Sequence, residues 1–134
     1  MPSSALQALL VRAGTALERG RGPDAVQLLA PALRSAGLPR EDEFAVRSAL
    51  AEAWLLQDDL EQAASALGRT PDTFRETISA SRLSTLWRLH GRLASARGDQ
   101  SRAIALEGRA LKQAETAHDS RAIGLAHYEL GHCY

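Results

Sequence analysis

Residues 86–111, LWRLHGRLASARGDQSRAIALEGRAL, decide how the rest of the chain is interpreted. The stretch indicates two helices joined by a tight turn at Gly98-Asp99. A small residue, Gly91, follows the bulky Trp87 in the first helix, and another small residue, Ala103, lies in the second. Two antiparallel helices at close range need a small residue on each at the crossing, with larger neighbours that interdigitate. The stretch therefore predicts a helical hairpin.

The small residues at this crossing recur along the chain at a nearly fixed interval. In the first helix of each predicted pair they are 38, 40 and 40 residues apart, and in the second helix 38 and 40 residues apart. The offset from the first helix to the second is 12 residues in every pair. Self-similarity at a fixed period is typical of helical-repeat proteins. The first series is Ala13, Ala51, Gly91 and Gly131, and the second is Ala25, Ala63 and Ala103.

Helical periodicity, capping residues and glycines predict the remaining elements. Asp59 and Asp119 precede predicted helices and are suited to capping them, because a short carboxylate accepts hydrogen bonds from the free N–H groups of the first turn. Pro31 lies inside a predicted helix and is expected to kink or split it, at a cost of roughly 3 kcal/mol. The predicted helices cover residues 4–19, 23–36, 41–57, 60–68, 80–97, 100–117 and 120–134, with a short extra turn or helix over 71–78.

The combined pattern resembles the tetratricopeptide repeat family, whose units carry a large residue, Leu-Gly or Leu-Ala, an aromatic residue, Gly-Asp and then spaced alanines. The likeness covers nearly the whole chain, although the interval exceeds the usual ~34 residues. His90 and Glu107 stand where the family has a leucine and an aromatic residue. The matching residues are Leu9, Ala13, Gly20, Ala25, Leu29 and Ala32; Leu50, Ala51, Trp54, Asp59, Ala63 and Leu67; Trp87, Gly91, Gly98, Asp99, Ala103 and Ala110; and Leu130, Gly131 and Tyr134.

The resemblance implies an all-α fold, a right-handed superhelix of antiparallel helix pairs with about three and a half repeats in 134 residues. The whole chain is expected to form a single helical-repeat domain. Within the family, the pattern is most similar to the longer, degenerate repeats of large bacterial regulators. The predicted units cover residues 4–38, 41–79, 80–118 and, incomplete, 119–134.

Composition limits the functions that are expected. Apolar residues make up 45% of the chain and charged residues 24%, as in a globular protein. The 16 basic and 16 acidic residues cancel, which argues against direct binding to nucleic acid or to a membrane. The single cysteine, Cys133, favours a reducing, cytoplasmic location. We expect no signal peptide, because a basic N-terminal segment is missing, and no membrane span, because no apolar run reaches roughly 18 residues.

Residues with catalytic or metal-binding chemistry form no recognised motif. Phosphate-binding loops, nucleophile elbows and paired zinc-ligand motifs are missing from the sequence. His127 and His132 lie near Cys133, but on a helix the two histidines are about 140° apart and do not share a face. Zinc needs three or four convergent ligands. We therefore expect no metal, no cofactor and no enzymatic activity.

The resemblance also implies a concave groove lined by the first helix of each unit. Arg88 and Arg92 are one helical turn apart and share a face, so they could clamp a carboxylate or an acidic peptide. The alternative is that both arginines pair with Glu52 or stay solvated. The groove residues expected to bind a peptide or protein are Ser48, Glu52, Arg88, Arg92, Ser95, Tyr128 and His132.

These observations favour a non-catalytic scaffold that binds a peptide or protein segment in its groove. A second hypothesis is a regulatory or sensor segment of a bacterial signalling or transcription protein, responding to a peptide or a small effector. The last predicted helix carries Leu125, Leu130 and Tyr134 with no following helix to cover them. We therefore expect either a longer array or a homodimer formed through the incomplete C-terminal repeat.

Overall fold

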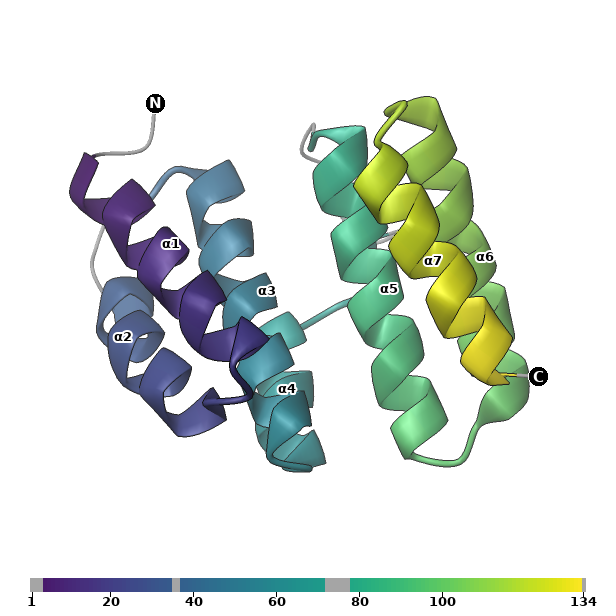
Figure 1. The fold of residues 1–134 in the computed structure, drawn as a ribbon, viewed down its shortest axis with the longest axis horizontal. Coiled ribbons are helices and arrows are strands. Elements are labelled where there is room, and N and C mark those ends of the chain that lie inside the picture. The colour runs from purple at the N-terminus through teal and green to yellow at the C-terminus, as the bar shows by residue number, and fades with distance from the viewer. Residues whose placement is uncertain (1–3, 35–36, 72–77, 134) are drawn as a thin grey trace. The chain divides into compact units, whose positions relative to one another are not determined.

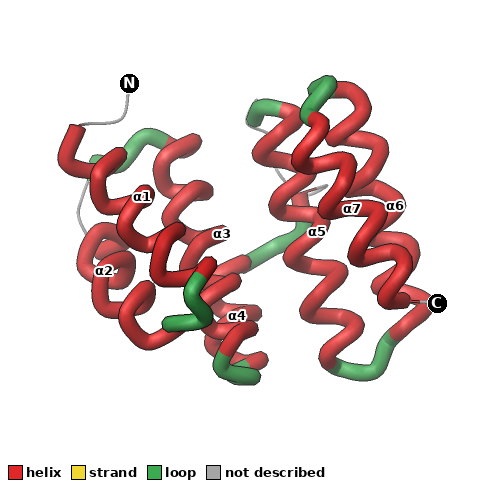
Figure 2. Tube along the Cα trace, viewed as in Figure 1, coloured by secondary structure: helices red, strands yellow, loops and turns green. Residues whose placement is uncertain are grey.

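The computed structural model describes residues 4–34, 37–71 and 78–133, and these residues form seven helices and no strand (Figure 1). Short loops, green in Figure 2, join most of the helices. None of the described helices is both long and apolar enough to span a membrane. The helices are α1 (Ser4–Glu18), α2 (Gly22–Arg34), α3 (Arg40–Leu56), α4 (Leu60–Leu67), α5 (Ala80–Ala96), α6 (Gln100–Thr116) and α7 (Ser120–Cys133).

The all-α class predicted from the sequence is confirmed, and each long predicted helix is present with ends that agree to within a residue or two. The turn or helix expected over 71–78 lies mostly outside the described residues. Two of the predicted caps are also confirmed: the backbone N–H of Gln62 donates to Asp59 Oδ1 at 3.2 Å, and that of Ala122 donates to Asp119 Oδ1 at 3.1 Å. Local sequence therefore sets where these helices begin.

Of the two effects expected at Pro31, a kink or a split, the split does not occur, because α2 continues through this residue to Arg34. Proline removes one N–H donor, which would otherwise reach the carbonyl group of Gln27 four residues earlier. Both Pro31 and Gln27 are exposed, so water can satisfy that carbonyl group. On its opposite side the helix is held by Leu29, which is fully buried. The free energy gained by burying Leu29 therefore outweighs the loss of one backbone hydrogen bond on the solvent-exposed side of the helix.

The chain forms two compact units, Met1–Ala66 and Leu67–Tyr134. In the first unit α1 and α2 form an antiparallel hairpin, and α3 packs against both of these helices (Figure 1). Their apolar faces meet in one core, which removes hydrocarbon surface from water and supplies most of the driving force for packing. The buried members of that core are Leu6, Ala13, Ala25, Leu29, Val46, Leu50 and Ala53.

In the second unit α5 and α6 form an antiparallel hairpin, and α7 packs against both (Figure 1). The turn between α5 and α6 passes through Gly98, whose φ of 85° lies in the left-handed region that glycine enters without strain. Asp99 caps α6 by accepting from the N–H of Arg102 at 3.1 Å. The start of α7 is tied to the start of α5, because the Ser81 hydroxyl donates to Asp119 Oδ2 at 3.1 Å.

The small residues expected at the helix crossings are buried in both hairpins. Ala13 and Ala25 in the first unit, and Ala103 in the second, are fully buried, and Gly91 is buried as well. Gly131, the last member of the series, is exposed, and a methyl group added there would meet nothing within 4 Å. The register read from the sequence therefore holds in these two hairpins but has no counterpart on α7.

Candidate functional site

A buried carboxyl group lies between α5 and α6 in the second unit. Glu107, on α6, is 1% exposed, and neither of its carboxyl oxygens forms a hydrogen bond with the described residues. Gly91, on α5, lies against it: a methyl group added to Gly91 would come within 2.6 Å of the carboxyl carbon. That distance is shorter than a van der Waals contact, so the glycine leaves the room that the carboxyl group occupies.

Three further charged groups surround Glu107, two from α5 and one from α7. Arg88 is 8% exposed, so its guanidinium group is largely removed from water. Arg92 is half-buried, and its Nε atom lies 3.7 Å from Oε1 of Glu129. The four residues therefore form a charge cluster, defined as Arg88, Arg92, Glu107 and Glu129, with two positive side chains and two acidic ones.

Burial dominates the electrostatics of this cluster. It raises the pKa of Glu107 from the ordinary 4.5 to about 8, and the negative charge of Glu129 acts in the same direction. Arg88 and Arg92 lower the pKa, but their effect is smaller than that of burial. At neutral pH the carboxyl group of Glu107 is therefore mostly protonated, and it becomes a buried anion only when the pH rises above about 8.

An exposed pair of rings lies on α7 close in sequence to the charge cluster. The ring centroids of Tyr128 and His132 are 4.2 Å apart at an interplanar angle of 43°. Tyr128 is 61% exposed, which is high for a large aromatic side chain. Glu129, next to it in sequence, forms the ion pair with Arg92. The aromatic pair is exposed on α7, and Glu129, about 100° around the helix from Tyr128, makes the contact with α5.

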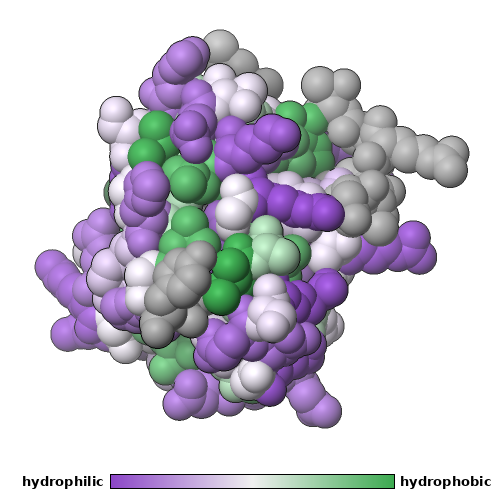
Figure 3. Space-filling model, turned by 90° about the vertical axis from the view of Figure 1, so that its right-hand side faces the viewer, coloured by the Kyte–Doolittle hydropathy of each residue, from purple (hydrophilic) through white to green (hydrophobic). Residues whose placement is uncertain are grey.

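The side of the second unit that includes α6 and α7 carries apolar atoms between charged and polar side chains (Figure 3). Among the α7 side chains that the structure describes, Ala126 alone is fully buried, while Ile123, Leu125 and Leu130 are half-buried. The sequence-based expectation that Leu125 and Leu130 lack a complete covering therefore agrees with their partial exposure.

Two of the residues predicted to bind a partner, Ser48 and Glu52, belong to the first unit, on α3. Ser48 is 4% exposed, and its hydroxyl donates to the carbonyl oxygen of Phe44 at 2.7 Å. The side chain of Ser48 is therefore turned back onto its own helix. Glu52, one turn further along α3, is half-buried.

The other five predicted residues belong to the second unit, on α5 and α7. Ser95 is half-buried, and its hydroxyl lies 3.5 Å from Oε1 of Gln100. The structure brings Arg92 against α7 through Glu129 and brings Tyr128 together with His132. Arg88 and Arg92 share a face as expected, and that face meets two carboxyl groups of the same chain, those of Glu107 and Glu129.

The sequence interpretation did not include Glu107 or Glu129 in the site. One signal could have identified Glu107, because it lies on the otherwise apolar stripe of α6 formed with Ala103, Ala110 and Ala114, all fully buried. Burying a charged side chain costs free energy unless an opposite charge or a hydrogen bond offsets the loss of water, so an acidic residue on an apolar stripe marks a special environment. Glu129 carries no comparable signal, because its pairing with Arg92 depends on how α7 packs against α5.

Metal-binding side chains do not cluster in the described part of the chain, where no three His, Cys, Asp or Glu residues converge. His90, which stands where the tetratricopeptide pattern has a leucine, is 8% exposed. No family model, curated protein or solved structure matches this chain. A functional assignment therefore depends on the geometry of the sites themselves.

Proposed function

We propose that the chain is a non-catalytic interaction module that binds a peptide or protein segment, and that α7 in the second unit contributes the contact. The exposed ring pair of Tyr128 and His132 is the observation that carries this proposal. Aromatic side chains are enriched at protein interfaces and supply much of the energy at their centres.

The arrangement of the ring pair supports a role in binding. Because the two rings already contact each other, little side-chain entropy remains to be lost when a partner covers them. The neighbouring ion pair of Arg92 and Glu129 is half-buried and holds α7 against α5, so the rings stand on a fixed support. A partner segment would cover Tyr128 with an apolar side chain.

We further propose that the helix pairs are tetratricopeptide-like repeats belonging to a cytoplasmic bacterial protein. The matched register of Ala13 with Ala25 and of Gly91 with Ala103 supports this, because both pairs are buried at the contact of their own hairpin. Proteins built from such repeats act mostly as binding surfaces.

Selection from a displayed peptide library on the purified chain, followed by calorimetry with the selected peptides, tests the proposed function. We expect Tyr128→Ala to weaken binding at least tenfold, since central aromatic contacts contribute about 2 kcal/mol or more. His127→Ala is the matched control, because His127 is also exposed on α7 but lies about 100° around the helix. If both variants bind every selected peptide as the parent does, the assignment of α7 is wrong.

A further inference from the structure

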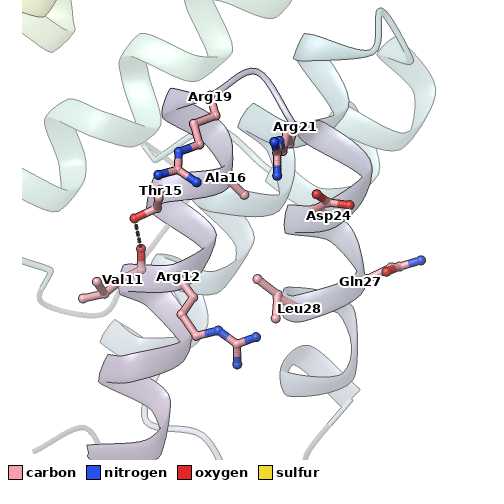
Figure 4. A pocket seen from close by; sticks show the side chains of 9 residues that line it. All are labelled: Val11, Arg12, Thr15, Ala16, Arg19, Arg21, Asp24, Gln27 and Leu28. Carbon is pink, nitrogen blue, oxygen red and sulfur yellow. Dashed lines mark hydrogen bonds between the residues drawn. The ribbon is translucent and has the colours of Figure 1, made fainter.

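A hollow in the first unit lies between α1 and α2, and it shares no residue with the charge cluster (Figure 4). Its volume is about 680 Å³, which is within the range of pockets that hold ligands. In Figure 4 the side chain of Arg12 extends from α1 toward α2 below Leu28, and Arg21 reaches down from the connection between the two helices. The hollow is a groove between the two helices of one hairpin.

Positive charge dominates the lining of this groove. The lining includes three arginines, Arg12, Arg19 and Arg21, and a single carboxylate, that of Asp24. The three guanidinium groups form no ion pair or side-chain hydrogen bond with the described residues. The whole chain has zero net charge, so the excess of two positive charges around this groove is a local accumulation of positive charge on an otherwise neutral protein.

Apolar and hydrogen-bonding groups accompany the arginines. Val11 is 68% exposed, and Leu28, half-buried, packs with its other side on the core of the first unit. Thr15 Oγ1 donates to the carbonyl oxygen of Val11 at 3.1 Å, so its lone pairs stay available to accept a hydrogen bond. A ligand that fits has carboxylates for the arginines, an apolar side chain and an N–H donor.

We propose that the groove between α1 and α2 binds an acidic peptide segment of a partner protein, with its carboxylates on Arg12, Arg19 and Arg21 and an apolar side chain over Val11 and Leu28. Arginine pairs well with carboxylates because its planar fork matches both oxygens. This groove uses the first unit alone and none of the α7 residues.

The spacing of the arginines defines the peptide. Arg12 lies on α1 and Arg19 directly follows its last residue, so their Cα atoms are about 10 Å apart along the direction of the helix. Along an extended peptide the side chains alternate between two faces, so residues on one face are two positions, or about 7 Å, apart. Two acidic residues four positions apart, with an apolar residue midway between them, therefore place all three side chains toward the groove, within the reach of the long arginine side chains.

The lining distinguishes a peptide from a nucleic acid. Single-stranded nucleic acids bind through stacking on aromatic side chains along a basic track, and no aromatic side chain lines this groove. Asp24 can accept hydrogen bonds from the N–H groups of a peptide backbone, and a phosphodiester backbone has no such donors.

The test uses the full chain and a fluorescein-labelled synthetic peptide with three Glu-Glu-Leu repeats, followed by fluorescence anisotropy at two salt concentrations. We expect saturable binding that weakens with salt, and a loss of at least tenfold in Arg12→Glu. Lys112→Glu makes the same change of charge on the exposed side of α6 and should alter the affinity less than twofold. Amide resonances of Thr15 and Gln27 should shift on titration with the peptide.

Three results would overturn the proposal: no binding of the acidic peptide, equal binding of a peptide with glutamine in place of every glutamate, or tighter binding of single-stranded DNA of the same charge. An unchanged affinity in Arg12→Glu would also overturn it. Tyr128→Ala should leave the acidic peptide bound as before, so failure of the α7 assignment and failure of this groove are distinguishable.

Discussion

The hairpins α1–α2 and α5–α6 share a register but fill one buried position differently. Four residues after the small residue of the second helix stands Leu29 in the first unit and Glu107 in the second. Leu29 is fully buried and Glu107 is 1% exposed, so both side chains are inside. In the first unit Leu29 shares an apolar core with Ala13, whereas in the second the equivalent of Ala13 is Gly91.

This difference shows what a helical hairpin needs in order to bury an acid. The methyl group of the opposing alanine is missing at Gly91, which gives the carboxyl group its volume. Arg88 and Arg92 supply positive charge on the same helix as that glycine. An apolar residue such as Leu29 needs neither, because only its hydrocarbon surface has to be covered.

The largest effect is expected when the acid is moved into the first unit as Leu29→Glu. The carboxyl group would be buried beside Ala13 without a glycine to make room, and we expect a loss of about 3–5 kcal/mol in the free energy of unfolding. Urea unfolding followed by circular dichroism measures it. Gln27→Glu, on the exposed side of the same helix, should change stability by less than about 0.5 kcal/mol. A cost below about 1 kcal/mol for Leu29→Glu would show that both hairpins accept an acid equally.

The next largest effect is expected for the variant Glu107→Gln, whose free energy of unfolding should depend on pH less than that of the parent. The folded-state pKa of about 8 exceeds the ordinary value of 4.5, so between these values the folded chain holds a proton that the unfolded chain has released. The stability that this proton provides is complete below about pH 4.5 and is lost as the pH rises through about 8. Glutamine does not ionise, so Glu107→Gln should gain on the parent by on the order of a few kcal/mol between pH 4.5 and pH 9.

The control for this pH series is Glu115→Gln, at an exposed position on the same helix. Its stability relative to the parent should stay nearly constant across the same range. A constant difference for Glu107→Gln as well would mean that Glu107 titrates like an exposed carboxyl group.

A smaller effect is expected from Gly91→Ala. The added methyl group would lie 2.6 Å from the carboxyl carbon of Glu107 and should cost about 1–3 kcal/mol. Gly108→Ala is the matched control, because a methyl group there meets nothing within 4 Å and should stabilise the helix by about 0.5–1 kcal/mol. The double variant Gly91→Ala with Glu107→Leu, which copies the first unit, should recover most of the loss; additive costs in the double variant would contradict the pairing.

Local chemistry made most of the fold predictable from the sequence. Caps such as Asp59 and Asp119 and the turn at Gly98 act within one turn of the chain, so their positions fix helix ends directly. The sequence alone did not show that α2 continues through Pro31, because this depends on Leu29, which is buried on the opposite side of the helix.

The candidate site was less predictable, because its contacts join helices that are distant in sequence. The departure at Glu107 was visible in the register, but its fit against Gly91 follows from the packing of α5 on α6. The pairing of Arg92 with Glu129 likewise follows from the packing of α7 on α5. Sequence spacing placed Tyr128 and His132 on one face, but only the structure gives the exposure of the tyrosine ring.

The ionisation of Glu107 can be observed by a carbon-13 NMR titration of the glutamate carboxyl groups in the full chain, with Glu107→Gln identifying the resonance. A buried, mostly protonated acid predicts a midpoint near pH 8. A midpoint near the ordinary 4.5 would contradict the burial of an uncharged carboxyl group between α5 and α6.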